Sequence, residues 1–135
     1  MDLASRIFLP LLFLSLAQAQ PSQSWHGKTS ENRELAISVA GATVDSVSLS
    51  IGVSCLQAVD EGTKVFSGSS GTISGKNIRF TGQATTACGT MQLRLDGTID
   101  GARASGNLTV IPPKQAENSE KKKVSWTAER GAPSR

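Results

Sequence analysis

The chain has 135 residues, a formal net charge of +3 and only 4% aromatic side chains. Nucleic-acid-binding proteins usually carry a concentrated basic stripe with aromatic side chains for stacking. Here the positive charge is spread out except at residues 121–123, and only four aromatic residues follow residue 19: Trp25, Phe66, Phe80 and Trp126. The composition therefore disfavours nucleic acid as a partner. It also disfavours glycan-binding surfaces, which usually need exposed rings.

The first 19 residues predict a cleavable secretory signal peptide. Arg6 precedes an apolar run over residues 7–16, and Ala17-Gln18-Ala19 forms a small-residue cleavage site. We expect cleavage between Ala19 and Gln20, and hence a periplasmic or secreted protein. The apolar run has about half of the roughly 20 residues that a transmembrane helix needs, so we expect no transmembrane span.

Residues 20–130 predict a single all-β domain, followed by a disordered tail over residues 131–135. Several segments alternate apolar and polar side chains with a period of two, which is typical of half-buried antiparallel strands. These segments lie at residues 35–39, 47–55, 78–80, 91–99, 104–110 and 124–128. We expect an antiparallel meander of seven to eight strands that forms a small closed barrel or a sandwich.

Glycines and polar stretches separate the alternating segments. Gly41, Gly75 and Gly101 stand where a hairpin turn needs a positive φ angle. The polar stretches at residues 57–63 and 112–122 are expected to be loops, and the second of them opens with two consecutive prolines.

Cys55 and Cys88 are the only cysteines, and both lie in the exported part. Two cysteines in an oxidising compartment most often form one disulfide bond. A redox pair would favour Cys-x-x-Cys spacing, and a zinc site needs three or four ligands, whereas His26 is the sole histidine. Cys55 ends an alternating segment and Cys88 lies in an irregular stretch over residues 85–90. The bond should therefore tie a strand end to a loop at one rim of the fold.

Trp25 and Trp126 fall near the two ends of the domain. In a closed barrel the first and last strands pair, so we expect these indoles to approach each other and close the seam as core residues. A role in the wall of a ligand site is the alternative.

A search for catalytic groups identifies no catalytic, cofactor-binding or metal-binding residue. Nucleophilic catalysis needs a base beside the nucleophile, and His26 stands alone near the start of the domain. The carboxylates of Asp60 and Glu61 belong to an expected loop, whereas Asp100 is explained by its turn. We therefore expect a protein that is not an enzyme and that holds no cofactor.

The domain opens with Trp25-His26-Gly27 and closes with Trp126-Thr127-Ala128. In this it resembles a loose group of small exported bacterial β-proteins without assigned function, which begin with Trp-x-Gly and end in a Trp-Thr-Ala strand. The resemblance implies an envelope or secreted location and carries over no catalytic or binding residue. The opening is also similar to that of avidin-like and lipocalin-like barrels, whose ring-rich interior is missing here.

These observations favour an exported non-catalytic domain that binds a protein or another component of the cell envelope. The alternative is a lipocalin-like carrier of a small ligand, and a small hydrolase ranks third. A barrel of about eight strands can be filled by its own side chains or can hold one small ligand. Whether the interior is filled or hollow separates the first two functions.

Overall fold

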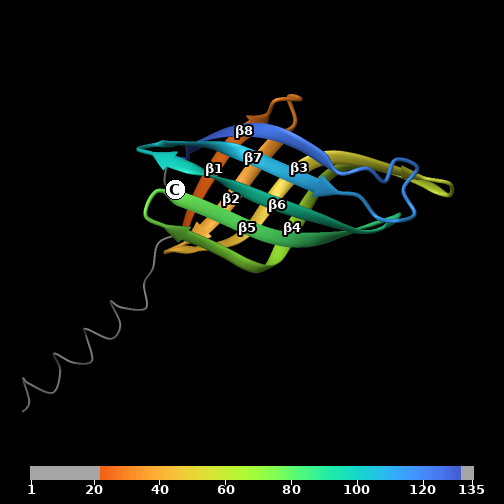
Figure 1. The fold of residues 1–135 in the computed structure, drawn as a ribbon, viewed down its shortest axis with the longest axis horizontal. Helices are drawn as coiled ribbons and strands as arrows, with labels where there is room; N and C mark the ends of the chain where they lie inside the picture. The colour runs from red at the N-terminus through yellow and green to blue at the C-terminus, as the bar shows by residue number, and fades with distance from the viewer. Residues whose placement is uncertain (1–21, 132–135) are drawn as a thin grey trace, which may run out of the picture.

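The computed structural model describes residues 22–131, which form eight strands and, within that range, no helix (Figure 1). The predicted signal peptide, its cleavage site at Ala19 and Gln20, and residues 132–135 of the predicted tail lie outside this range. No helix in residues 22–131 is long and apolar enough to cross a membrane. The strands are β1 (Ser22–Thr29), β2 (Glu34–Ala40), β3 (Thr43–Cys55), β4 (Ala58–Ser74), β5 (Asn77–Thr86), β6 (Gly89–Asp100), β7 (Arg103–Ile111) and β8 (Lys122–Arg130).

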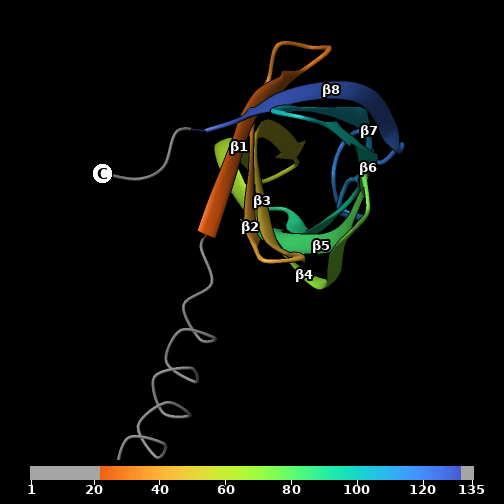
Figure 2. The same ribbon diagram turned by 90° about the vertical axis from the view of Figure 1, so that its left-hand side faces the viewer.

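Every strand pairs antiparallel with its neighbour in the chain, and β1 pairs with β8, so the sheet closes into a barrel. Figure 2 looks at one end of this ring of strands. The all-β expectation is confirmed, and of the two predicted architectures the barrel is the one that forms. Closure leaves no strand at a sheet edge along most of the wall.

Alternation along the strands sends one set of side chains into the barrel. In β5 every second residue is buried, from Ile78 to Thr86. Burying one large apolar side chain stabilises a fold by roughly 1.5–3 kcal/mol, so this inner set is the main source of stability. The most deeply buried large side chains are Trp126, Phe66, Ile37, Ile78, Met91, Leu93, Leu95, Leu108 and Val47.

Because the chain is a meander, its connections alternate between the two ends of the barrel. The far end, on the left in Figure 1, carries three tight turns that contain Gly41, Gly75 and Gly101. Their φ angles are 62°, 61° and 66°, which confirms the predicted turns. The other end, which we call the mouth end, carries the turns at residues 30–33, 56–57 and 87–88 and the loop at residues 112–121.

A disulfide bond between Cys55 and Cys88 joins two of the connections at the mouth end, with 5.8 Å between the Cα atoms. It links the end of β3 to the turn between β5 and β6, as the sequence predicts. The stretch around Cys88 is more regular than expected, because β5 continues to Thr86 and β6 begins at Gly89. Only Ala87 and Cys88 remain in a two-residue turn.

The predicted loop at residues 57–63 is wrong, because β4 begins at Ala58. Its inner face there carries Asp60 and Lys64, which form an ion pair, and its outer face carries the exposed Val59. Because Asp60 and Lys64 are polar, this part of β4 lacks the alternation of apolar and polar residues that would have predicted a strand. The ion pair between the two side chains offsets part of the cost of removing their charges from water.

Trp25 and Trp126 lie on the paired strands β1 and β8, and both are almost fully buried. They occupy different levels of the seam, since Trp25 is opposite Arg130 and Trp126 is opposite Thr29. The Trp126 indole extends over β7 towards β6, where its Nε1–H donates to the backbone carbonyls of Asp96 (3.2 Å) and Asn107 (3.1 Å).

Candidate functional site

One side of the barrel wall is incomplete at the mouth end. Pairing between β2 and β3 stops at Leu49, and pairing between β1 and β8 stops at Trp126. Residues 50–55 of β3 and 122–125 of β8 therefore have no strand partner on the sides that face each other. We call this opening the side window. It arises because the hairpin of β1 and β2 is shorter than the strands on either side of it.

The side window is framed on all sides. The loop at residues 112–121 folds back onto β3, where the Glu117 N–H donates to the Ser54 carbonyl at 2.8 Å and Ala116 bridges to Cys55. At the opposite corner the Ser30 N–H donates to the Ser125 carbonyl, also at 2.8 Å. The loop and the turn between β1 and β2 thus bound an opening whose two other sides are strand edges.

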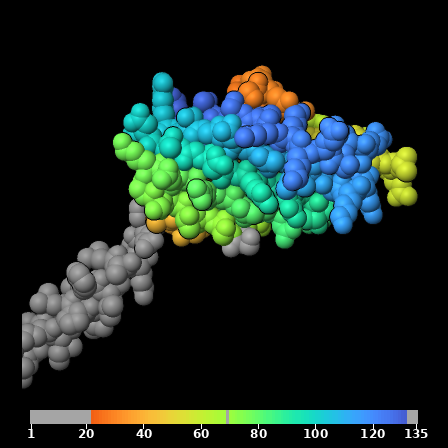
Figure 3. All heavy atoms as spheres, viewed as in Figure 1, coloured from red at the N-terminus to blue at the C-terminus, as the bar shows by residue number. Residues whose placement is uncertain are grey.

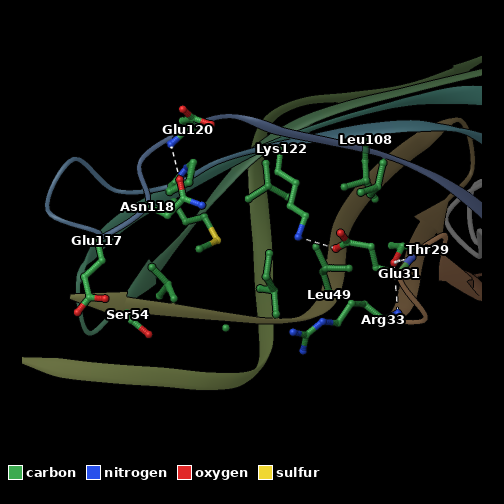
Figure 4. A pocket seen from close by; sticks show the side chains of 17 residues that line it. Thr29, Glu31, Arg33, Leu49, Ser54, Leu108, Glu117, Asn118, Glu120 and Lys122 are labelled. Carbon is green, nitrogen blue, oxygen red and sulfur yellow. Dashed lines mark hydrogen bonds and ion pairs between the residues drawn. The ribbon is translucent and has the colours of Figure 1, made fainter.

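Behind the side window lies a pocket of about 340 Å³ that reaches the inner face of the barrel (Figure 4). The pocket therefore adjoins the inner face of the barrel near its mouth end, where Leu49, Met91 and Leu108 are themselves buried. No aromatic residue is among those that line the pocket. Its floor consists of aliphatic side chains together with one methionine: Leu49, Ile51, Val53, Met91, Leu108, Val110 and Val124.

Charged side chains stand at the rim of the pocket. The Lys122 Nζ and the Glu31 carboxylate are 2.7 Å apart and join β8 to the turn between β1 and β2. Arg33, on the same turn, pairs with Glu61 of β4 at 2.8 Å. Each of these side chains is about half exposed, and exposed ion pairs contribute at most about 1 kcal/mol to stability. The rim can therefore rearrange at small cost.

Thr29 stabilises the turn that carries Glu31 and Arg33 through two side-chain hydrogen bonds. Its Oγ1 accepts the N–H of Glu31 at 3.3 Å and the N–H of Arg33 at 3.2 Å. Thr29 is itself buried and lines the pocket. The two rim charges are thus presented by a turn with a defined backbone.

A second charged group supports the wall beside the pocket. Asp60 accepts hydrogen bonds from the Lys64 ammonium and, at 2.8 Å, from the backbone N–H of Ala87. Both bonds stabilise the charged carboxylate, so they lower the pKa of Asp60 below its ordinary value despite the opposing effect of desolvation. This group connects β4 to the turn between β5 and β6, next to the disulfide bond.

The remaining residues considered in the sequence lie outside this pocket. His26 is on the outer face, in register with Glu129 across the seam, and not in an internal cleft. Within residues 22–131 the Trp25 Nε1 has no hydrogen-bond partner, and the Arg130 guanidinium lies 5.3 Å from the centre of the Trp25 ring. The described part of the chain contains no group of three or more potential metal ligands.

The pocket is not apparent from the amino-acid sequence. Alternation does place Leu49, Met91 and Val110 on the inner set, but an inner position can face either a neighbouring side chain or empty space. The signal that could have indicated an opening is the difference in strand length. β1 and β2 are short, whereas β3, which follows them, is long. Searches with protein-family models, curated proteins and solved structures find no match to this chain.

Proposed function

We propose that this is an exported, non-catalytic binding protein that holds a small, largely apolar ligand in the pocket behind the side window. The observation that carries the proposal is the pocket at the mouth end of the barrel, with its aliphatic floor and its opening to solvent. A volume of about 340 Å³ falls in the range of roughly 300–1,000 Å³ that is usual for small-molecule sites. Of the three functions weighed from the sequence, a ligand carrier fits this geometry best.

The proposed location is the periplasm or the extracellular medium. A disulfide bond is typical of proteins in oxidising compartments. The signal-peptide pattern at residues 1–19 supports the same location independently. The outer position of His26 gives no support to the hydrolase alternative, because the depression that it lines with Ser105 and Glu129 lies on the outer wall of the barrel.

The test is the binding of decan-1-ol, an uncharged probe with a flexible chain, to the disulfide-bonded protein that begins at Gln20. We expect decanol to shift the methyl NMR signal of Met91, which lies on the pocket floor. Val124→Phe should weaken binding at least roughly fivefold, because the new ring occupies pocket volume. Val65→Phe is the matched control, since Val65 is 57% exposed on the outer wall.

Decanol binding that Val124→Phe leaves unchanged would place the probe elsewhere and overturn the proposal. Absence of saturable binding, in protein whose disulfide bond is intact by mass spectrometry, would do the same. Native mass spectrometry of protein isolated from its exporting cell adds a direct observation, because a retained ligand appears as a defined mass increment.

A second candidate function is the binding of a protein, and it is favoured by the end of the hairpin of β3 and β4. This hairpin protrudes from the body of the molecule (yellow in Figure 3), and its turn residue Leu56 is 96% exposed, with Val59 74% exposed nearby. Exposed apolar side chains on a protruding element are typical of interaction sites. Capture from envelope extract tests this function. Loss of a reproducible partner in Leu56→Ser, but not in Val65→Ser, would support it.

A further inference from the structure

We infer that the ligand of this pocket is an alkyl carboxylate, with its chain on the aliphatic floor and its carboxylate at Lys122. The inference rests on the proposed function and adds to it the chemical class of the ligand. It follows from the composition of the floor, from the charges of the rim and from their relative positions.

The floor selects a flexible aliphatic chain over a planar ring system. Among the lining residues there is no tryptophan, tyrosine, phenylalanine or histidine on which a ring could stack. Leu49, Leu108 and Val110 offer branched aliphatic surfaces, and Met91 adds an unbranched side chain that adapts to irregular shapes. Such a surface gains free energy from any buried methylene group, by about 0.8 kcal/mol each, without imposing a ring geometry.

The rim places a cation directly above this floor. Figure 4 shows the Lys122 side chain reaching into the opening between Leu49 and Leu108, with its ammonium group at the Glu31 carboxylate. Lys122 thus already binds a carboxylate, supplied by the turn between β1 and β2. Both partners are about half exposed, so a ligand carboxylate can replace Glu31 while Glu31 turns into solvent.

The pocket lining carries two cations, Arg33 and Lys122, and three carboxylates, those of Glu31, Glu117 and Glu120, so an anionic ligand must compete with a carboxylate that is already present. Arg33 stands on the same turn and adds a second positive charge, although Glu61 already pairs with it. The carboxylates of Glu117 and Glu120 belong to the loop, and in Figure 4 they lie away from the Lys122 ammonium. Among the three carboxylates that line the pocket, Glu31 is the one that pairs with Lys122, and it therefore competes with a ligand carboxylate there.

Because Glu31 competes with the ligand for Lys122, a change at Glu31 should affect anionic and cationic ligands in opposite directions. Removing its charge by Glu31→Gln should strengthen the binding of an anion, because Lys122 becomes free. The same change should weaken the binding of a cation, because the nearest carboxylate is lost. For one partly exposed ion pair the expected change is roughly three- to fivefold in either direction.

The experiment measures the dissociation constants of decanoate, decan-1-ol and decylamine by titration calorimetry at pH 7, below the concentrations at which these probes form micelles. The proteins are the wild type, Glu31→Gln, Lys122→Gln and, as a matched control outside the pocket, Glu34→Gln. Urea unfolding of each variant checks that the fold is unchanged. We expect decanoate to bind the wild type more tightly than decanol does.

Glu31→Gln should tighten decanoate binding, Lys122→Gln should reduce it to the level of decanol, and Glu34→Gln should change little. Decanol binding should be the same in all four proteins. Tightest binding of decylamine, equal binding of all three probes, or weaker decanoate binding in Glu31→Gln would overturn the carboxylate assignment and leave the pocket as a ligand site. If none of the probes binds, the proposed function itself fails.

Discussion

The disulfide bond between Cys55 and Cys88 should supply a large part of the stability of this domain. It closes a segment with a sequence separation of 33, which contains β4 and β5. In the chain-entropy model, cross-linking across this separation removes conformational entropy from the unfolded chain that is worth about 3.7 kcal/mol at 25 °C. Domains of this size are typically stable by about 5–15 kcal/mol, so the bond is a substantial fraction of the total.

The perturbation is the double variant Cys55→Ala/Cys88→Ala. Cys88 is buried, so its replacement adds a small loss of packing to the entropic effect, whereas Cys55 is only half-buried. We expect the free energy of unfolding to fall by about 3–5 kcal/mol and the urea midpoint to fall by roughly 2–3 M.

Tryptophan fluorescence during urea unfolding is the assay. Trp25 and Trp126 are both buried, so their emission should move to longer wavelength when the barrel opens. Wild-type protein unfolded in the presence of a reductant serves as a second route to the open chain and should unfold at a similar midpoint. A loss below about 1 kcal/mol in the double variant would refute the reasoning, because the unfolded chain would then not be the state that the bond constrains.

Three further changes test the core and the wall. Gly97→Ala should destabilise the protein by about 1–3 kcal/mol and red-shift the fluorescence, since the new Cβ would clash with the Ser105 carbonyl oxygen and lie 2.7 Å from the Trp126 ring. At Gly75 the φ angle is +61° and a new Cβ would meet nothing within 4 Å. Gly75→Ala should therefore lower the free energy of unfolding by only about 1 kcal/mol and leave the emission unchanged. Equal effects of the two variants would contradict this reasoning. Asp60 has a lowered pKa, so its pairing with Lys64 contributes stability above the ordinary carboxyl pKa of about 3.9. That stability is lost as pH falls through the lowered value, and Asp60→Asn should reduce the dependence of unfolding on pH below 4. An unreduced slope in acid unfolding curves would exclude this role.

Much of the barrel was predictable because its signals are local. Alternation marks inner and outer faces in six of the strands, and Gly41, Gly75 and Gly101 mark turns through their positive φ angles. The first residues of β4 were predicted as a loop, because the polar side chains of Asp60 and Lys64 take inner positions there. A charged residue on an inner face is recognisable only when its partner, four residues away in the chain, is known to lie beside it.

The sequence by itself determined the all-β class, the inner faces of most strands and the position of the disulfide bond at a strand end. These properties depend on side-chain period, turn chemistry and the number of cysteines. Tertiary structure alone decided that the barrel closes and that a pocket opens at its mouth end. It also brought Lys122 next to Glu31, which is 91 positions away in the chain. The physical reason is that a cavity depends on the relative lengths and stagger of all strands at once, and no local pattern contains that information.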